Sequence, residues 1–308
     1  MEHLPVMFAE ALQQLAIKKN GVYLDCTFGR GGHSQGILDR LGPSGRLLAF
    51  DRDADAINSD YAQAMLKDKR FQLIHNCFSE LENIVISEGL AGYVDGILMD
   101  LGVSSPQLDN PERGFSFLRD GPLDMRMNGN AGVSAAQWLA TVDEQDLVKV
   151  LFEYGEERFA RRIARAVIER RAQSPITTTG QLASLIEEAV PAREKHKHPA
   201  TRTFQAIRIE INRELEELKD VLQQSARVLK PGGRLVVISF HSLEDRIVKR
   251  FIRDESGAKY NPGKLPVKEI DIDKGLFKKV SKALKADKQE IAQNPRARSA
   301  VMRVAERV

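Results

Sequence analysis

The chain has 308 residues, of which 42% are apolar and 29% are charged, and its net charge is +3. This composition is typical of a globular protein, and two cysteines are too few for a disulfide framework, so a disordered chain and a disulfide-stapled secreted domain are both excluded. No apolar run reaches the length of a membrane span and no leader pattern opens the sequence, so we expect a cytoplasmic protein with reduced thiols and no membrane partner.

The first hundred residues alternate between strand and helix patterns. A helical stripe over Phe8, Leu12 and Leu15 comes first. Ser79 and Glu82 form a candidate capping box at the start of a later helix. Such alternation predicts a parallel sheet with helices on both faces. We expect strands at 22–27, 46–51, 70–75 and 94–101, and helices near 33–41, 53–66 and 79–88.

The alternation then stops and later resumes. A loop rich in Gly, Pro, Asp and Ser occupies 102–132, and only helical patterns follow over 134–198. A long helix is expected from Arg202 to Leu229, ended by Pro231-Gly232-Gly233. After it we expect an apolar strand at 235–240, a helix from Leu243 to Ile252, and short runs near 277–280 and 300–305.

We therefore predict an α/β fold in which a doubly wound sheet is interrupted by an all-helical insertion. The predicted boundaries are 1–107 for the first part of the sheet domain, 108–198 for the insertion and 199–308 for the second part.

A cluster of glycines follows the first predicted strand. The sequence Gly29-Arg30-Gly31-Gly32 comes soon after Asp25, and the next strand ends in Asp51. Glycines let a ligand approach the backbone closely, and an acid about 20 residues further on can accept both hydroxyls of a ribose. Because the Gly-x-Gly-x-x-Gly spacing that holds a pyrophosphate is missing, a nucleoside without phosphates, such as S-adenosylmethionine, is favoured over a dinucleotide.

Acids end three of the four early strands, namely Asp25, Asp51 and Asp100. Ligands of open parallel sheets bind at the carboxyl ends of the strands, so three acids at one rim predict a binding site. The alternative for the segment from Asp100 to Gln107 is a loop that only caps a helix.

Basic residues gather in three places. Arg158, Arg161, Arg162 and Arg165 share one face of a helix, and further patches lie at 193–213 and 278–308. Each patch alone is an ordinary solvated face, but together they raise the expectation of a polyanionic partner. The histidines, His196 and His198 among them, form no zinc pattern, and Trp138 is expected in the core of the insertion.

At these motifs the chain resembles the RsmH (MraW) family of S-adenosylmethionine-dependent cytosine-N4 methyltransferases of small-subunit ribosomal RNA. The resemblance spans the chain and is weakest over 254–290. The motifs that carry it are Phe28–His33, Asp51–Asp53, Asp100–Gln107, Arg113–Phe117, Gly121–Met127, Tyr154–Glu157, His198–Ala206, Ser239–Arg246 and Asn294–Ser299.

The resemblance implies a class I methyltransferase sheet, a cytidine in the decoding region of 16S rRNA as target, and the small ribosomal subunit as substrate. It implies no metal site, and it leaves open whether the protein forms a homodimer. Asp100 is the first choice for the catalytic group that accepts hydrogen bonds and the proton from the target amine, and His241 is the second choice. His241 could alternatively line a pocket or cap a helix. The implied cofactor residues are Gly31, Gly32, His33, Asp51, Phe78, Asp100 and Gln107.

Two other functions compete with this one. An NAD-dependent oxidoreductase could use a related sheet, but the glycine spacing and the Pro-Gly-Gly before a late strand argue against it. A ribosome-binding protein without activity could keep the same fold, and the intact glycine loop argues against that.

Overall fold

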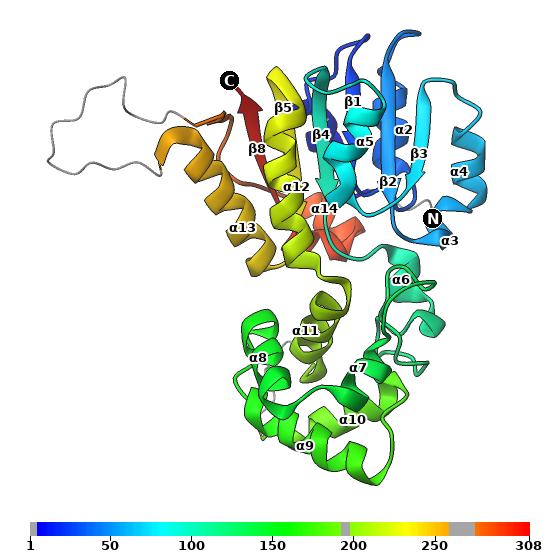
Figure 1. Cartoon of the computed structure of the whole chain (residues 1–308), viewed down its shortest axis with the longest axis vertical. Helices are drawn as coiled ribbons and strands as arrows, with labels where there is room; N and C mark the ends of the chain where they lie inside the picture. Colours follow the sequence, from blue (N-terminus) through cyan, green and yellow to red (C-terminus); the bar gives the residue numbers. More distant parts are fainter. Residues whose placement is uncertain (1–4, 192–197, 259–274) are drawn as a thin grey trace, which may run out of the picture. The chain divides into compact units, whose positions relative to one another are not determined.

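The computed structural model describes residues 5–191, 198–258 and 275–308 (Figure 1). The chain forms two compact units, one made of Met1–Gly102 and Leu215–Val308 and the other of Val103–Glu214. The second unit begins earlier and ends later than the predicted insertion, 108–198, because α11 (Ala200–Asn212) packs on α8 (Glu144–Gly155) within it.

The first unit contains a mixed sheet with the order β3-β2-β1-β4-β5-β8-β6, and β7 also pairs with β8. Strands β1 to β5 are parallel, whereas β8 runs antiparallel to β5. The predicted doubly wound α/β class is therefore confirmed. The strands are β1 (Val22–Asp25), β2 (Arg46–Asp51), β3 (Phe71–His75), β4 (Val94–Asp100), β5 (Leu229–Ser239), β6 (Phe277–Lys279), β7 (Leu284–Lys285) and β8 (Val301–Arg307).

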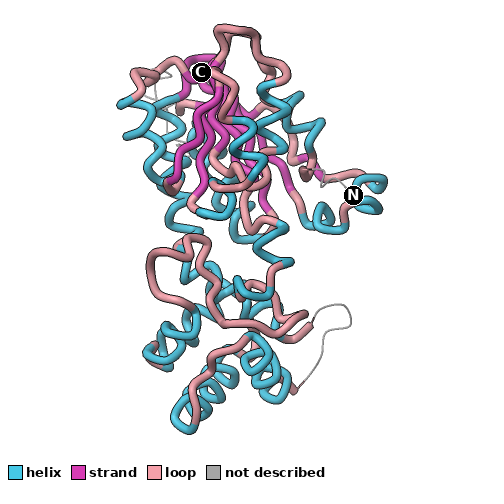
Figure 2. The backbone as a smooth tube through the Cα atoms, turned by 90° about the vertical axis from the view of Figure 1, so that its right-hand side faces the viewer, coloured by secondary structure: helices cyan, strands magenta, loops and turns pink. Residues whose placement is uncertain are grey.

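Helices cover both faces of this sheet (Figures 1 and 2). One apolar core joins the sheet to α5 (Leu81–Ser87), α12 (Glu214–Val228) and α13 (Ser242–Arg253). The other joins it to α1 (Phe8–Gln14), α2 (Gly32–Leu38) and α4 (Asp60–Met65). The remaining elements are α3 (Ala54–Ile57), η1 (Phe78–Glu80), a helical turn η3 (Asp254–Ala258), α14 (Lys288–Gln293) and η5 (Pro295–Ser299).

The second unit is built from helices around its own apolar core. The loop predicted at 102–132 contains two short helical elements, and Trp138 packs partly buried against the core. Along the described residues of the whole chain, no helix is both long and apolar enough to cross a membrane. The remaining helices here are α6 (Ser105–Asp109), η2 (Pro111–Arg113), α7 (Ala135–Thr141), α9 (Ala160–Gln173) and α10 (Thr179–Ala189).

Five local predictions were wrong. The helix predicted near 53–66 is split into α3 and α4. Arg158, predicted on one helix face with Arg161, lies in the turn before α9. Ser79 caps no helix, because it lies inside η1 and α5 begins after Glu80 without a side-chain cap. The helix predicted over 202–229 is broken in two at Arg213, whose φ of 50° is left-handed. The Pro-Gly-Gly segment does not precede β5 but lies inside it, where the pairing with β4 shifts register.

Candidate functional site

The three predicted acids are the last residues of their strands. Asp25 ends β1, Asp51 ends β2 and Asp100 ends β4. Because these strands are neighbours in the order β2-β1-β4 and run parallel, the acids share the carboxyl edge of the sheet. The structure thus brings together the acids that the sequence placed at separate strand ends.

The glycine loop follows β1 and leads into α2. Gly29 and Gly31 both have positive φ, 54° and 71°, which suits glycine. A Cβ on Gly31 would lie 2.8 Å from the rings of Phe28 and Tyr61, so only glycine fits there. The backbone N–H of Gly29 donates to Asp51 Oδ2 over 2.8 Å, which ties the loop to the second strand.

Asp51 is arranged as an acceptor of hydrogen bonds. Its Oδ2 accepts from Gly29, and its Oδ1 accepts from the backbone N–H of Asp53 over 2.8 Å. Burial raises the pKa of Asp51 to about 6, although both backbone hydrogen bonds act to lower it. Each carboxylate oxygen can accept more than one hydrogen bond, so the side chain keeps capacity for the hydroxyls of a ligand.

The carboxylate of Asp25, by contrast, accepts hydrogen bonds from other groups of the protein. Its Oδ2 accepts from Ser34 Oγ over 2.6 Å, and its Oδ1 accepts from the backbone N–H of Thr27 over 3.1 Å. Burial raises the pKa of this carboxyl, and the three hydrogen bonds from Ser34 and Thr27 oppose the rise. Asp25 therefore fixes the turn between β1 and α2.

Asp100 is the least satisfied of the three acids. Its backbone N–H donates to Thr27 Oγ1 over 2.7 Å, but its Oδ1 is buried and has no hydrogen-bond partner among the described residues. Burial raises the pKa of Asp100 well above its usual range, and the charges of Asp25, Glu244 and Glu290 add to the rise. An unsatisfied buried acceptor costs folding free energy and is a reason to expect a ligand at this position.

His33 faces Asp100 from the first turn of α2. Its Nδ1 lies 3.6 Å from Asp100 Oδ2, and the residue is only 5% exposed. Burial lowers the pKa of His33 to about 4, so the ring is neutral at neutral pH and this contact is not an ion pair there. Its Nε2 also has no partner within the described chain. These two facing side chains each leave a buried polar atom open among the described residues, which fits a polar ligand such as the amino-acid end of the implied cofactor.

The other predicted cofactor residues lie in different surroundings. Phe78 begins η1 just after β3 and packs, partly buried, against the apolar core. Gln107 belongs to the second unit, where its Oε1 accepts from the backbone N–H of Ser104 over 2.9 Å in a capping box of α6. The alternative that this segment caps a helix is therefore correct for the side chain of Gln107.

His241 is the residue before α13, and its placement depends on a neighbour that the sequence analysis missed. Glu244 is 2% exposed, and its Oε2 accepts from the backbone N–H groups of Phe240 and His241 over 2.8 and 3.2 Å. Its Oε1 lies 3.0 Å from His241 Nε2. A Glu three residues after the residue that precedes a helical pattern is the available signal for such a cap.

The two cysteines differ in their surroundings. Cys26 is buried, and burial together with the charge of Asp25 raises the pKa of its thiol well above the ordinary value. Cys77 is partly exposed, with its Sγ 3.0 Å from Ser79 Oγ. A thiol held in its neutral form is a poor nucleophile, so Cys26 is not prepared for covalent catalysis.

The second unit presents a basic surface on α9. Its apolar side, with Ile163 and Val167, is buried in the core. The opposite side forms what we call the arginine face, and none of its members is ion-paired within the described residues. The arginine face consists of Arg158, in the turn before α9, and of Arg161, Arg162 and Arg165 on the helix, all exposed.

A second basic patch was predicted at 193–213, but Arg193 and His196 lie outside the described residues. His198, which is described, stacks on Phe117 with ring centroids 4.5 Å apart. Its Nε2 lies 2.6 Å from Glu187 Oε1, so this histidine serves packing within the second unit.

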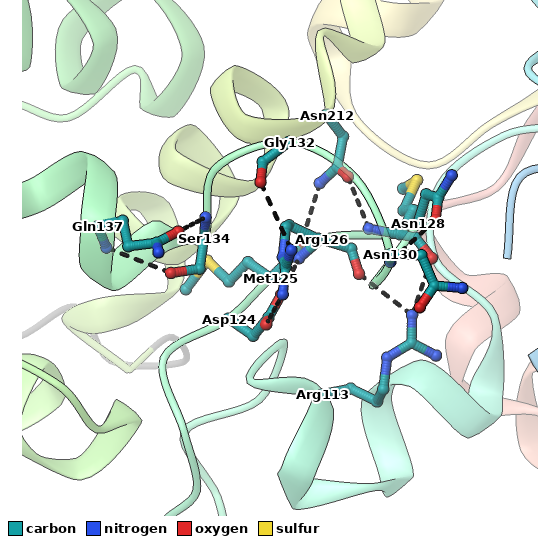
Figure 3. A network of polar contacts seen from close by, with 11 residues as sticks. Arg113, Asp124, Met125, Arg126, Asn128, Asn130, Gly132, Ser134, Gln137 and Asn212 are labelled. Carbon is teal, nitrogen blue, oxygen red and sulfur yellow. Dashed lines mark hydrogen bonds and ion pairs between the residues drawn. The ribbon is translucent and has the colours of Figure 1, made fainter. Parts of the chain in front are cut away.

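A network of hydrogen bonds holds the loop after η2 in the second unit (Figure 3). Asn212 donates to the carbonyl of Met125 and accepts from the N–H of Met127, both over 2.8 Å. Met125 has a φ of 62°, a costly conformation for a side chain of its size, and these bonds maintain it. Arg126 and Asp124 pair beside it, with Nη2 and Oδ2 2.7 Å apart.

Comparison with known proteins identifies close relatives along the full length. The profile of the MraW methylase family matches residues 1–308. The protein named ribosomal RNA small subunit methyltransferase H of Alteromonas mediterranea is 57% identical over 309 residues, which cover 100% of this chain and 98% of the relative. The protein of the same name from Pseudoalteromonas atlantica is 56% identical over 307 residues, covering 99% and 98%.

One solved structure resembles this chain distantly. The putative rRNA-methylase from Clostridium thermocellum aligns with a TM-score of 0.44 and 11% identity, covering 99% of this chain and 98% of that one.

Proposed function

Because this chain belongs to the MraW methylase family, we propose that it transfers a methyl group from S-adenosylmethionine to the exocyclic N4 of a cytidine in the decoding region of 16S rRNA. The full-length relatives named as small-subunit rRNA methyltransferases support the substrate class. The observation that carries the chemistry is the buried Oδ1 of Asp100 at the carboxyl edge of the sheet, which has no hydrogen-bond partner in the described parts of the chain.

The cofactor would lie at this edge. Asp51 would accept hydrogen bonds from the ribose hydroxyls, while the glycine loop admits the ligand to the backbone. His33 Nε2 and Asp100 Oδ1 would satisfy the amino-acid end, and Phe78 would lie against the adenine. When bound, S-adenosylmethionine supplies an electrophilic methyl group and a positive charge that favours the ionised form of Asp100. The proposed cofactor residues of the sheet unit are Gly31, Gly32, His33, Asp51, Phe78 and Asp100, and a cofactor role for Gln107 of the second unit stays a prediction from the sequence.

Asp100 is also our first choice for activating the target amine. The N4 amine of cytosine is a weak nucleophile because its lone pair is delocalised into the ring. An acceptor that takes a hydrogen bond from the amine draws the nitrogen toward tetrahedral geometry and receives the proton that the reaction releases. The raised pKa of Asp100 makes its carboxylate a stronger base than an ordinary aspartate. His241, held by Glu244, is the second choice.

The thiols favour methylation of nitrogen over carbon. Methylation at C5 of cytosine needs a thiolate to attack the ring, and burial keeps the Cys26 thiol in its neutral form. Positioning and electrostatic stabilisation are enough for transfer to an amine. This contrast supports N4 as the target atom.

The second unit would serve the RNA. Its arginine face offers exposed cations of the kind that bind phosphates. Segment 108–198, the predicted insertion, is proposed as the substrate-recognition part.

The deciding experiment is mass spectrometry of nucleosides from 16S rRNA of cells with and without this protein. We expect N4-methylcytidine to be lost when the protein is absent and restored when it is supplied. Loss of 5-methylcytidine instead would overturn the N4 assignment, and an unchanged nucleoside profile would favour a binding protein without activity. Titration with each cofactor tests the oxidoreductase alternative, because we expect S-adenosylmethionine to bind and NAD not to bind.

A further inference from the structure

The last part of the chain forms a cationic margin along the free side of the sheet. Strands β6 and β7 both pair with the outer side of β8, with Lys279 opposite Ala305 and Lys285 opposite Val301. The connection between them contains Lys282, and α14 and η5 follow before the chain enters β8. At about 3.4 Å per residue, the four steps from Ala305 to Val301 span about 14 Å.

Five cations of this last part of the chain are exposed and have no ion pair with any described residue. Three lie on β6, β7 and the connection between them, and two lie on α14 and η5, which follow. We call them the basic edge: Lys279, Lys282, Lys285, Lys288 and Arg298.

The acids of the same segment are engaged elsewhere. Asp287 accepts the backbone N–H of Glu290 over 2.7 Å as the cap of α14. Glu290 accepts the backbone N–H of Met7 over 2.6 Å. Glu306 is paired with Lys278 and Arg234, at 2.6 and 2.8 Å. None of these three acids forms an ion pair with a cation of the basic edge among the described residues.

Lysines also protect exposed strands from pairing with other chains. That role accounts for charges on β6 and β7, but not for Lys288 on α14 or Arg298 on η5. Protection also depends only on the presence of charge and not on its sign. The two explanations therefore predict different results when the sign is reversed.

We propose that the basic edge binds the phosphate backbone of the RNA substrate and so gives the sheet unit its own RNA contact, in addition to the arginine face. This inference rests on the proposed function for the identity of the substrate as RNA. Several unpaired cations along about 14 Å match the repeated charges of a nucleic-acid strand better than they match a single anion. The contact is electrostatic and independent of sequence, so it contributes affinity and position while the cytidine is selected elsewhere.

The test is a charge-reversal variant, Lys279→Glu, Lys282→Glu, Lys285→Glu and Lys288→Glu together. A glutamate at each position keeps a charged sheet margin, and at position 288 it suits the first turn of α14. The matched control reverses four exposed lysines elsewhere on the same unit, namely Lys19, Lys67, Lys69 and Lys219, with the same change in net charge.

Binding to small ribosomal subunits and to 16S rRNA is measured over a range of salt concentrations. We expect the basic-edge variant to bind about tenfold or more weakly and the slope of log affinity against log salt to fall by about three. The methyl-transfer KM should rise, while kcat at saturating RNA and cofactor affinity stay at the wild-type level. The control should bind as the wild type does.

If RNA binding weakens equally in the basic-edge variant and the control, the effect comes from net charge alone and the proposal is overturned. Wild-type RNA affinity in the basic-edge variant would also overturn it. If that variant does not fold, judged by its thermal transition, the corresponding four Lys→Gln changes replace it with the same expected direction. Failure of the proposed function is separable, because salt-dependent RNA binding through the basic edge would then persist in a protein that transfers no methyl group.

Discussion

The carboxyl edge of the sheet and the arginine face of α9 are opposites in physical character. At the sheet edge, Asp51 and Asp100 are half-buried, and loss of hydration raises the pKa of each carboxyl. On this face, Arg158 in the turn before α9 and Arg162 on α9 are exposed and have no partner among the described residues. The first region holds charge where water cannot solvate it well, and the second leaves charge in water.

This difference separates two kinds of recognition. Buried acceptors are costly in the free protein, so a ligand that satisfies them regains that cost and is bound with defined geometry. Exposed cations cost little and attract any polyanion at a distance, with strong dependence on salt. We therefore expect substitutions at the sheet edge to change chemistry and cofactor affinity, and substitutions on α9 to change RNA affinity.

The largest effect should come from Asp100→Asn, which keeps the shape of the side chain but removes its charge. Loss of one preorganised group that acts on the reacting atoms costs about 10³-fold in kcat, so single-turnover methyl transfer should fall by about that factor. Asp95→Asn, at the other end of β4, is the control and should leave the rate of transfer unchanged.

The stability of the Asp100→Asn variant shows whether the fold is intact. Because the folded-state pKa of Asp100 is raised, the wild type loses stability as pH rises through that pKa, whereas the variant does not. The ligand-free variant should therefore melt at or above the wild-type temperature at pH 8. Full activity in the variant would remove Asp100 from the mechanism and leave His241 as the candidate.

The next largest effect should be on the cofactor affinity of Asp51→Ala. Two hydrogen bonds from hydroxyls to a charged acceptor contribute about 1.5–3 kcal/mol each, so the Kd should rise about 10²-fold or more. Calorimetric titration of the folded variant measures this. Wild-type affinity would show that the ribose is held elsewhere.

The pH dependence sharpens the same assignment. With a pKa of about 6 in the free protein, Asp51 is protonated at lower pH and then accepts hydrogen bonds less well. Wild-type cofactor affinity should therefore fall as pH is lowered through about 6. The Asp51→Ala variant should lack this component of the pH profile.

A smaller effect is expected from replacing Arg158, Arg162 and Arg165 by Ala. Alanine favours helix, so α9 should remain folded. Binding to small subunits should weaken, and the salt slope should fall by about one for each phosphate that the variant no longer binds. If this variant lost cofactor affinity but bound small ribosomal subunits as the wild type does, the assignment of RNA binding to the arginine face would be wrong.

The smallest effect should come from Cys26→Ala with Cys77→Ala, which we expect to retain methyl transfer with somewhat reduced stability. Burial of Cys26 makes a cavity the main consequence of its replacement. RNA with 5-fluorocytidine at the target should form no stable adduct with the wild type on denaturing gels. A covalent adduct that either substitution abolishes would overturn the N4 assignment.

Much of the sheet could be predicted from the sequence because its signals are local. Apolar runs marked both ends of β2 and the starts of β1 and β4 correctly, although the predicted bounds 22–27 and 94–101 run past Asp25 and Asp100. The helix predicted from Leu243 to Ile252 matches α13. The break at Arg213 was missed because a left-handed arginine leaves no mark in the periodicity of apolar residues. The strand through Pro231-Gly232-Gly233 was missed because these residues usually end an element.

The sequence by itself determined the fold class, the glycine loop and the acids at the strand ends, since each depends on residue type and spacing along the chain. Only the tertiary structure decided how these acids differ. Asp25 is satisfied by Ser34 and Thr27, whereas Asp100 Oδ1 is left open. Likewise, Glu244 acquires its place beside His241 only when β5 and α13 are both formed. Burial and the supply of hydrogen-bond donors are properties of packed neighbours, so the pattern along the chain cannot specify them.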